Sequence, residues 1–391
     1  MDRNIFDEEH EMFRDAARSF LQKEIGPHAE RWAEQEIVDR EAFLKTGEQG
    51  MLCMWADEKY GGAGVTDFRY EQILLEENAK YGDVGFFIFL HSRLVGPYIG
   101  SLGTEEQKAR WLPKCVSGEN VLAIAMTEPG AGSDVSGIRT KAEDKGDHYL
   151  LNGSKTFISN GILADLVIVA AKTDPNSSHG LSLLVVERGM PGFERGKNLK
   201  KMGMHSQDTA ELFFNNVKVP KENLLGEWNR GFYHLMHFLA EERLLSAVGS
   251  LANAEAAFAV TIDYASERQV FGKKVADYQV NRFKFADMRT EMDVAQAFID
   301  RCVMVHNEGN LTADDAAKAK LYATELEDRV TDQCVQLHGG NGYMEEYPIS
   351  RMYTAARVSR IYAGSSEIMR EIIARSIGLD PRKKLSKKDA A

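Results

Sequence analysis

Residues 121–134 read VLAIAMTEPGAGSD, and this stretch decides the fold. Its first five residues form a short apolar run, and a loop rich in glycine follows directly. Short apolar runs bounded by turn residues are typical of β-strands. The chain before this point has another pattern, because apolar residues such as Met12, Ala16 and Phe20 recur at helical spacing. The stretch therefore marks the change from a helical region to a β-region.

The strand-like pattern continues to about residue 225 and then ends. Apolar or alternating runs occupy residues 148–151, 166–171, 181–186 and 210–214, with turn residues between them. The pair Asn152-Gly153 predicts a tight turn into a strand, and the even spacing predicts a small barrel or sandwich.

Proline-free segments follow at residues 252–266 and 313–337, and their length and composition predict bundle helices. We therefore expect a mainly α fold with a central β-domain. Residues 1–120 would form an N-terminal helical domain, residues 121–228 a middle β-domain, and residues 229–391 a C-terminal helical bundle.

Composition excludes several classes of protein. The net charge of −11 argues against a nucleic-acid partner, because an acidic surface repels phosphate groups. No apolar run reaches the roughly 18 residues of a membrane span, and no N-terminal stretch resembles a signal peptide. The four cysteines form no CxxC or Cys/His pattern, which predicts a reducing compartment and no metal site.

Two segments of the β-region have the composition of a ligand site. In residues 126–134, two glycines beside a proline fix a loop whose backbone can approach a ligand closely, although a plain hairpin loop has the same composition. In residues 152–161, Phe157 and Ser159 would share one strand face, which suits a flat ring with polar edges. Ordinary core packing is the alternative for this second segment.

Two further segments lie in the C-terminal region. Arg268 could bind a phosphate group and Phe271 could stack on a purine, and Gln279 follows nearby in the sequence. A helix that ends at a glycine, with a cation near its C-terminus, gives the same pattern. Residues 336–342, QLHGGNG, would end a helix with exposed amides that suit a diphosphate. They lack the spacing of a Rossmann fingerprint, and His338 alone is as well explained as a capping or core residue.

Together, and in this order, these segments resemble the acyl-CoA dehydrogenase family over essentially the whole chain. Residues 127–134, 336–342 and 361–368 (IYAGSSEI) have the most specific likeness, which is closest to the long-chain and isovaleryl branches. The resemblance implies a helical domain, a β-barrel and a helical bundle, assembled as a homotetramer. It also implies FAD as cofactor, α,β-dehydrogenation of an acyl-CoA to the trans-2-enoyl-CoA in fatty acid β-oxidation, and re-oxidation by an electron-transfer flavoprotein. The location would be the cytoplasm of a bacterium or the mitochondrial matrix.

The resemblance also implies site residues. FAD would be bound by Met126, Thr127, Gly132, Ser133, Phe157, Ile158, Ser159, Arg268, Phe271, Gln279, Gln336, Leu337, His338, Gly339, Gly340, Ser365, Ser366 and Glu367, with Arg268, Phe271 and Gln279 reaching the FAD of a neighbouring subunit. The acyl-CoA would be bound by Ser133, Tyr233, Arg243, Ala363 and Gly364.

The chain departs from the common family pattern at Ala363, where most members have the catalytic glutamate. The long-chain and isovaleryl branches use an acid on the first helix of the C-terminal bundle, and Glu242 occupies that place here. At about 100° per residue, Glu242 lies about 20° from the inward direction of Leu235, whereas Glu241 lies about 120° away. Glu242 is therefore the predicted catalytic base, with a pKa raised by burial.

The substrate and the electron acceptor remain open at this point. Phe86 and Phe87 stand where long-chain relatives tend to have smaller residues, so they would shorten an acyl channel if their rings pointed into it. In that case the enzyme would prefer substrates with short, medium or compact acyl groups. If the two rings instead pack in the core of the domain, they say nothing about the substrate. An acyl-CoA oxidase and a catalytically silent acyl-CoA-binding protein are the rival functions.

Overall fold

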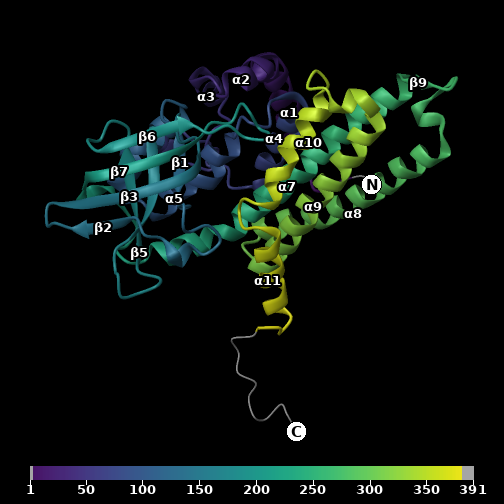
Figure 1. Cartoon of the computed structure of the whole chain (residues 1–391). Helices are drawn as coiled ribbons and strands as arrows, with labels where there is room; N and C mark the ends of the chain where they lie inside the picture. Colours follow the sequence, from purple (N-terminus) through teal and green to yellow (C-terminus); the bar gives the residue numbers. More distant parts are fainter. Residues whose placement is uncertain (1–2, 381–391) are drawn as a thin grey trace, which may run out of the picture.

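The structure is a computed structural model, and it describes residues 3–380. Helices come first, a sheet follows, and helices end the chain (Figure 1), as the sequence predicts. The N-terminal helices are α1 (Glu8–Phe20), α2 (Ala29–Gln35), α3 (Arg40–Glu48), α4 (Phe68–Tyr81), α5 (Gly96–Leu102) and α6 (Glu105–Val116). A short π-helical segment, Leu90–Val95, precedes α5.

Helix α1 forms where the apolar spacing predicts a helix. Ala17 and Phe20 are buried, whereas Met12 is 67% exposed and Ala16 is also exposed. The spacing of Met12, Ala16 and Phe20 therefore indicates a helix without marking its buried face, and α1 packs against α4.

The middle domain is a single eight-stranded sheet in the order β6-β7-β3-β2-β4-β5-β8, with β1 pairing in parallel with β4. The strands are β1 (Leu122–Ala125), β2 (Lys141–Asp144), β3 (His148–Ser159), β4 (Leu166–Lys172), β5 (Leu181–Glu187), β6 (Phe193–Asn198), β7 (Thr209–Pro220) and β8 (Leu224–Leu225). Sequence patterns predicted five of them. They missed β2, β6 and β8, which are short or mostly polar.

The predicted turn at Asn152-Gly153 is wrong, because β3 runs straight through these residues. The pairing of β3 with β7 shifts register between Leu151 and Gly153, which identifies a β-bulge. Gly153 has φ 144°, and a Cβ atom there would approach Thr140 Oγ1 to 2.5 Å. The glycine therefore serves close packing against the residue before β2, and not a chain reversal.

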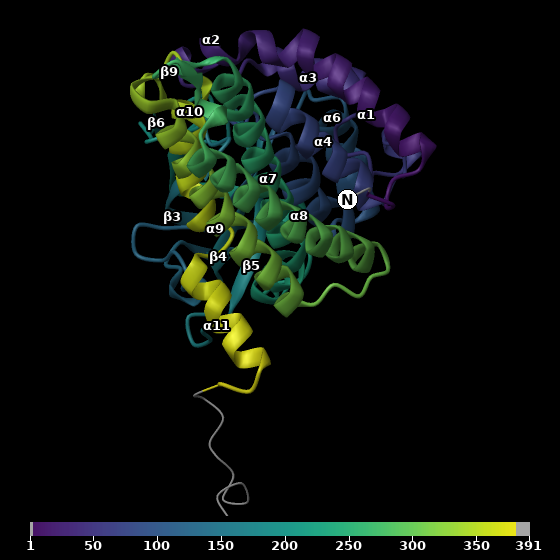
Figure 2. The ribbon, with the colours of Figure 1, turned by 90° about the vertical axis from the view of Figure 1, so that its right-hand side faces the viewer.

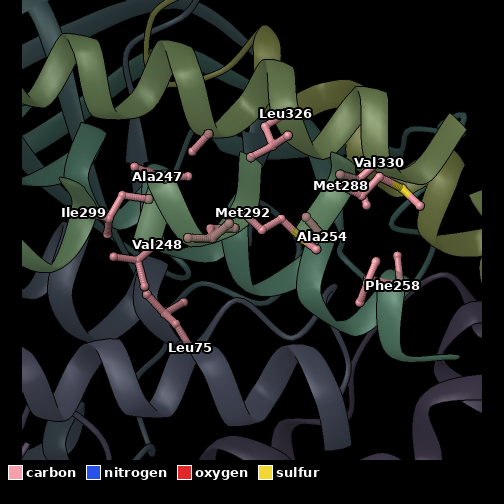
Figure 3. Close-up of a cluster of buried hydrophobic side chains, with 14 of the residues drawn as sticks. Leu75, Ala247, Val248, Ala254, Phe258, Met288, Met292, Ile299, Leu326 and Val330 are labelled. Atoms are coloured by element: carbon pink, nitrogen blue, oxygen red, sulfur yellow. The ribbon is translucent and has the colours of Figure 1, made fainter. Parts of the chain in front are cut away.

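The C-terminal helices are α7 (Gly231–Glu267), α8 (Gln279–Asn307), α9 (Ala313–His338), α10 (Pro348–Ala356) and α11 (Ser366–Ser376). Figure 2 shows α7 between the N-terminal helices and α8 and α9, and α7 contacts α4, α8 and α9. The core between them is drawn in Figure 3, where Leu75 of α4, Val248 of α7, Met292 of α8 and Leu326 of α9 meet.

Helix α7 is long and apolar enough to cross a membrane by length and composition alone. However, 67% of its most apolar window is buried within the protein, as expected for the central helix of a helical core. Burial on several sides also explains why its apolar residues are not confined to one stripe.

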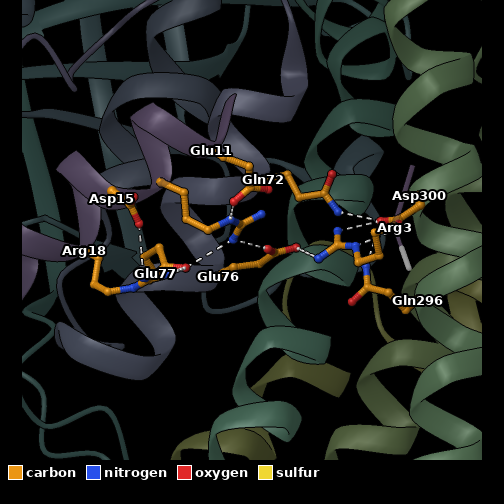
Figure 4. A network of polar contacts seen from close by, with 10 residues as sticks. Arg3, Glu11, Asp15, Arg18, Gln72, Glu76, Glu77, Gln296 and Asp300 are labelled. Atoms are coloured by element: carbon orange, nitrogen blue, oxygen red, sulfur yellow. Dashed lines mark hydrogen bonds and ion pairs between the residues drawn. The ribbon is translucent and has the colours of Figure 1, made fainter. Parts of the chain in front are cut away.

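A polar network joins the N-terminal helices to the bundle (Figure 4). Arg3 forms ion pairs with Glu76 of α4 and Asp300 of α8, and Arg14 of α1 pairs with Glu76 at 2.8 Å. Gln72 of α4 also donates to Asp300 at 2.8 Å. The network fixes α4 against α8, and α4 forms one wall of the cavity described below.

Candidate active site

Glu242 lies on the buried face of α7, 4% exposed, with Leu235 and Phe238 on the same face. Tyr98 of α5 is also buried, and its hydroxyl donates to Glu242 Oε1 at 3.0 Å. Burial raises the pKa of Glu242 to about 7, although the hydrogen bond from Tyr98 and the charge of Arg243 oppose this shift. A carboxyl group with such a pKa can accept a proton near neutral pH.

Glu241 has a different environment. Its carboxylate forms an ion pair with Arg93 at 2.6 Å and with His306 at 3.2 Å. Burial would raise the pKa of Glu241, but the hydrogen bond and charge of His306 and the charge of Arg93 outweigh it and lower the pKa. Glu241 is therefore an ionised structural group. The predicted separation of the two glutamates onto different sides of α7 agrees with these contacts.

A small cavity of about 30 Å³ lies along the same face of α7 as Glu242. Leu245, Ser246 and Gly249 line it and follow Glu242 at helical spacing, so they lie on one side of the helix. The opposite wall includes Leu75 and Ala79 of α4 with Phe87 and Phe89, and Tyr362 closes a third side. The cavity thus lies between α4 and α7, next along the helix face that carries Glu242, and most of its lining residues are apolar.

The structure separates the two phenylalanines that the sequence could not distinguish. Phe86 packs in the N-terminal core, with its ring centroid 5.0 Å from Phe43 and 6.0 Å from Trp32. Phe87 lines the cavity beside Phe89, at a centroid distance of 4.9 Å. Of Phe86 and Phe87, only Phe87 can therefore limit the size of a group that enters the cavity.

The loop before α11 contains Ala363, which has φ 51°, and Gly364, which has φ 90°. Such values are uncommon for alanine and show that the surrounding structure holds the loop in place. Lys320 of α9 donates to the Gly364 carbonyl at 2.7 Å. Ser365, Ser366 and Glu367 follow at the first turn of α11, where Ser365 is the N-cap.

The glycine-rich loop after β1 lies against the end of β3. The Thr156 amide donates to the Thr127 carbonyl at 2.9 Å, which brings residues 126–134 beside Phe157 and Ser159. Phe157 is 69% exposed and has φ 58°, whereas Ile158 is buried in the core of the sheet. Only the backbone of Ile158 can face a cofactor.

A buried ion pair supports this loop. Lys155 is 1% exposed, and its Nζ donates to the Met126 carbonyl and to Glu128 Oε1, both at 2.9 Å. Glu128 also accepts from the amides of Arg139 and Thr140. Burial lowers the pKa of Lys155 to about 8. The pair connects β3, the glycine-rich loop and the residues before β2.

The loops of the middle domain and the C-terminal bundle meet in one apolar cluster. Met126 and Tyr362 both pack against the cluster that contains Tyr98, Leu235 and Phe238. The structure therefore brings the glycine-rich loop, the Ala363 loop and the Glu242 face of α7 to one region.

The other predicted cofactor residues lie at the opposite end of α7. The helix ends at Glu267, about 38 Å along its axis from Glu242. Arg268 caps this end, Phe271 is 99% exposed in the hairpin of β9 (Gln269–Val270) and β10 (Lys273–Lys274), and Gln279 begins α8. Figure 1 shows the β9 hairpin and α11 at opposite ends of the bundle. Within one chain these residues are therefore remote from Glu242.

Residues 336–340 are at this same end. His338 stacks on Tyr264 of α7 at a centroid distance of 4.1 Å, and its Nδ1 is 2.9 Å from the Cys334 carbonyl. Burial lowers its pKa, so His338 is a buried packing residue. Gln336 and Leu337 complete the last turn of α9. Around Gly339 and Gly340, an added Cβ atom would meet nothing within 4 Å, so these backbone groups face open space.

Tyr233 and Arg243 of α7 differ in their exposure to solvent. Tyr233 is in the first turn of α7 and 49% exposed, beside Arg230. Arg243 is 6% exposed, and burial lowers its pKa. Among residues 3–380, no group of His, Cys, Asp or Glu is arranged to hold a metal ion.

Three residues of this region are not predicted by any pattern in the sequence: Tyr98, Lys155 and Lys320. Lys155 and Glu128 stand in the two segments with the composition of a ligand site, but no pattern in the sequence connects them. Lys320 stands on a buried face of α9 that also holds Thr324 and Glu327, so no pattern in the sequence marks it.

Comparison with known proteins identifies the family. Residues 7–119, 123–217 and 229–378 match the acyl-CoA dehydrogenase N-terminal, middle and C-terminal domains. The chain is 48% identical to the long-chain specific acyl-CoA dehydrogenase of Rattus norvegicus over 381 residues, which cover 97% of this chain and 88% of that protein. It is 38% identical to the isovaleryl-CoA dehydrogenase of Pongo abelii, covering 96% and 90%.

Solved structures agree. An acyl-CoA dehydrogenase from Geobacillus kaustophilus is 50% identical with a TM-score of 0.95, covering 97% of this chain and all (100%) of that one. An acyl-CoA dehydrogenase complexed with FAD, from Bacillus anthracis, is 32% identical with a TM-score of 0.89, covering 95% and 67%. The chain therefore belongs to the acyl-CoA dehydrogenase family and is an FAD-dependent oxidoreductase.

Proposed function

We propose that this enzyme converts an acyl-CoA to the trans-2-enoyl-CoA, with Glu242 as the catalytic base. The position of Glu242 is the observation that carries the proposal. Its carboxyl group is buried and has a pKa of about 7, and residues on the same face of α7 line a cavity with mostly apolar walls. An isolated buried carboxyl group costs free energy, so its retention beside a cavity favours a catalytic role.

In this reaction Glu242 takes the α-proton of the thioester, and the double bond forms as a hydride leaves the β carbon. FAD, when bound, accepts that hydride with its electron pair. Tyr98 orients the carboxyl group of Glu242 through the bond to Oε1. The Ala363 amide is the proposed donor to the thioester oxygen, where negative charge develops. Replacing the usual glutamate by alanine removes a base at that position but keeps the amide.

The residues present suit FAD. Gly130 and Gly132 have open space where a Cβ would stand, and Phe157 exposes its ring beside them. We propose that the flavin contacts are made by Met126, Thr127, Gly132, Ser133, Phe157, Ile158, Ser159, Ser365, Ser366 and Glu367. Ser133, Tyr233, Arg243, Ala363 and Gly364 are the proposed acyl-CoA contacts.

Anaerobic addition of acyl-CoA thioesters tests the function. We expect the flavin absorbance to bleach with at least one thioester of a series that varies in length and branching. An electron-transfer flavoprotein should then restore the absorbance, whereas peroxide formation in air at a comparable rate would identify an acyl-CoA oxidase. An enzyme that binds thioesters without bleaching would be a silent homologue, and the proposal would be wrong.

We further propose an assembly in which Arg268, Phe271, Gln279 and residues 336–340 bind the FAD of a neighbouring subunit, in a homotetramer. The distance of about 38 Å along α7 supports this arrangement. Arg268→Ala should lower FAD occupancy and weaken assembly together, because one side chain serves both. FAD content per chain and molar mass by light scattering measure the two effects. Lys273→Ala, an exposed change in the same hairpin, is the control and should alter neither.

The cavity supports a preference for short, medium or compact acyl groups. Phe87→Ala should therefore move the optimum of kcat/KM to longer acyl chains. Each additional buried methylene contributes about 0.8 kcal/mol, or roughly fourfold in kcat/KM. Phe86→Ala is the matched control, because it removes a core ring and should cost about 3–5 kcal/mol of stability without moving the optimum. A maximum with palmitoyl-CoA in the unaltered enzyme would contradict the preference.

Three further proposals come from the sequence and the family. The domain boundaries are residues 1–120, 121–228 and 229–391, of which residues 1–2 and 381–391 lie outside the described part. The pathway is fatty acid β-oxidation. The location is the bacterial cytoplasm or, for a processed chain, the mitochondrial matrix, and fractionation of the source cell would test it.

A further inference from the structure

Lys320 is a buried cation near the proposed active site. It lies on α9 with a relative exposure of 0%, and its Nζ donates to the Gly364 carbonyl at 2.7 Å. Within residues 3–380, no carboxylate lies within ion-pair distance of this ammonium group. Burying an ammonium group without a counter-ion is unfavourable. If Lys320 only filled space, an apolar side chain would serve the fold better.

The carbonyl that Lys320 binds belongs to a loop with unusual backbone geometry. Ala363 and Gly364 both have positive φ, and a Cβ atom on Gly364 would come within 2.7 Å of Met369 Cε. Tyr362, on the other side, packs against the apolar cluster near Glu242. The Ala363 amide therefore lies between one residue held by packing and one held by Lys320.

A second buried cation lies close to Lys320. Arg243 follows Glu242 on α7, and no hydrogen bond partner for its Nε is found among the described residues. Burial lowers the pKa of Lys320 to about 8. The charge of Arg243 adds to this shift, and the more weakly acting charges of Glu327, Glu367 and Glu325 oppose it. Lys320 thus contacts the Ala363 loop from α9, and Arg243 on α7 lies near enough for its charge to act on Lys320. Positive charge fixed in a buried site favours negative charge that develops nearby.

We propose that Lys320 is a positioning residue for the thioester oxygen site. Its ammonium group holds the Gly364 carbonyl so that the Ala363 amide faces the thioester oxygen, and its charge, together with that of Arg243, favours the enolate. This inference rests on the proposed dehydrogenation. It adds a residue from α9, a helix that contributes no other group to the reacting region.

The test compares Lys320→Met with Lys318→Met in the FAD-loaded enzyme. Lys318 is on the same helix, but it is ion-paired with Asp314 and its side chain is 41% exposed. The probe is 3-thiabutyryl-CoA, in which sulfur replaces the β carbon, so the α-proton can leave but no hydride can follow. The bound enolate gives a long-wavelength absorbance band beside oxidised flavin. Titration of this band with pH gives the apparent pKa of the bound probe.

We expect Lys320→Met to raise the apparent pKa of the bound probe by at least about one unit, which is a tenfold loss of enolate. The value of kcat should fall about tenfold or more while KM changes little. The melting temperature and FAD content should not fall, because the variant removes a buried charge. Lys318→Met should match the unaltered enzyme in every measurement.

A variant Lys320→Met with unchanged probe pKa and kcat would overturn the inference. The inference would also be overturned if the loss of kcat in Lys320→Met were fully explained by a lower FAD content. If Lys320→Met does not fold, Lys320→Ala removes both the donor to the Gly364 carbonyl and the charge, and an unchanged probe pKa there would also overturn the inference. The dehydrogenation itself fails separately, if the unaltered enzyme gives neither the probe band nor bleaching with any acyl-CoA.

Discussion

Glu242→Gln should lose about 10²–10⁴-fold in turnover while it keeps FAD and binds acyl-CoA. The amide cannot accept the α-proton, yet it has the size of the carboxyl group and can still accept the hydrogen bond from Tyr98. Single-turnover bleaching of the flavin under anaerobic conditions measures the loss directly. Binding of the thioester, followed by the small spectral shift of the flavin, should change little.

The pH profile supplies a second readout for this residue. The base must be deprotonated, and burial raises the pKa of Glu242 to about 7. In the unaltered enzyme kcat/KM should therefore rise about tenfold per pH unit below neutrality and become level above it. The residual activity of Glu242→Gln should lack this rise.

Glu241→Gln is the matched control, and it should stay within a few-fold of the unaltered enzyme in turnover. The structure adds an expectation for its stability. The substitution removes the charge that pairs with Arg93 and His306, so it should cost about 1–3 kcal/mol. Full turnover in Glu242→Gln, or a larger loss in Glu241→Gln, would place the base elsewhere.

Lys155→Met should destabilise the protein by about 3–5 kcal/mol, because it leaves Glu128 buried without its cation. It also removes the donor to the Met126 carbonyl, so the loop of residues 126–134 loses its side-chain support from β3 and keeps the backbone bond from Thr156. We therefore expect faster loss of FAD on dilution as well as a lower melting temperature. Thermal unfolding and flavin fluorescence measure the two effects.

Two comparisons make this expectation specific. Lys141→Met removes the exposed pair with Glu143 and should cost less than about 1 kcal/mol. The double variant Lys155→Met with Glu128→Leu removes both charges and should recover part of the lost stability. If Lys155→Met has the same melting temperature as the unaltered enzyme, the buried pair does not support the loop.

The sequence by itself determined the order of helical, β and helical regions and the family of the enzyme. It also placed Glu242 on the buried face of its helix and Glu241 away from it. These features depend on local spacing, because the period of an apolar pattern reports the type of element and the angle of each residue around it. The long, strongly patterned helices and strands were accordingly predicted best.

Only the tertiary structure decided which residues meet. It paired Tyr98 with Glu242, Lys155 with Glu128 and Lys320 with the Gly364 carbonyl, across separations in sequence that no periodic pattern spans. It also assigned Phe87 and not Phe86 to the cavity. A pattern gives the direction of a side chain about its own element, but its partner depends on how whole elements pack. For the same reason Gly153 proved to be a bulge, since its need for glycine arises from the neighbouring Thr140.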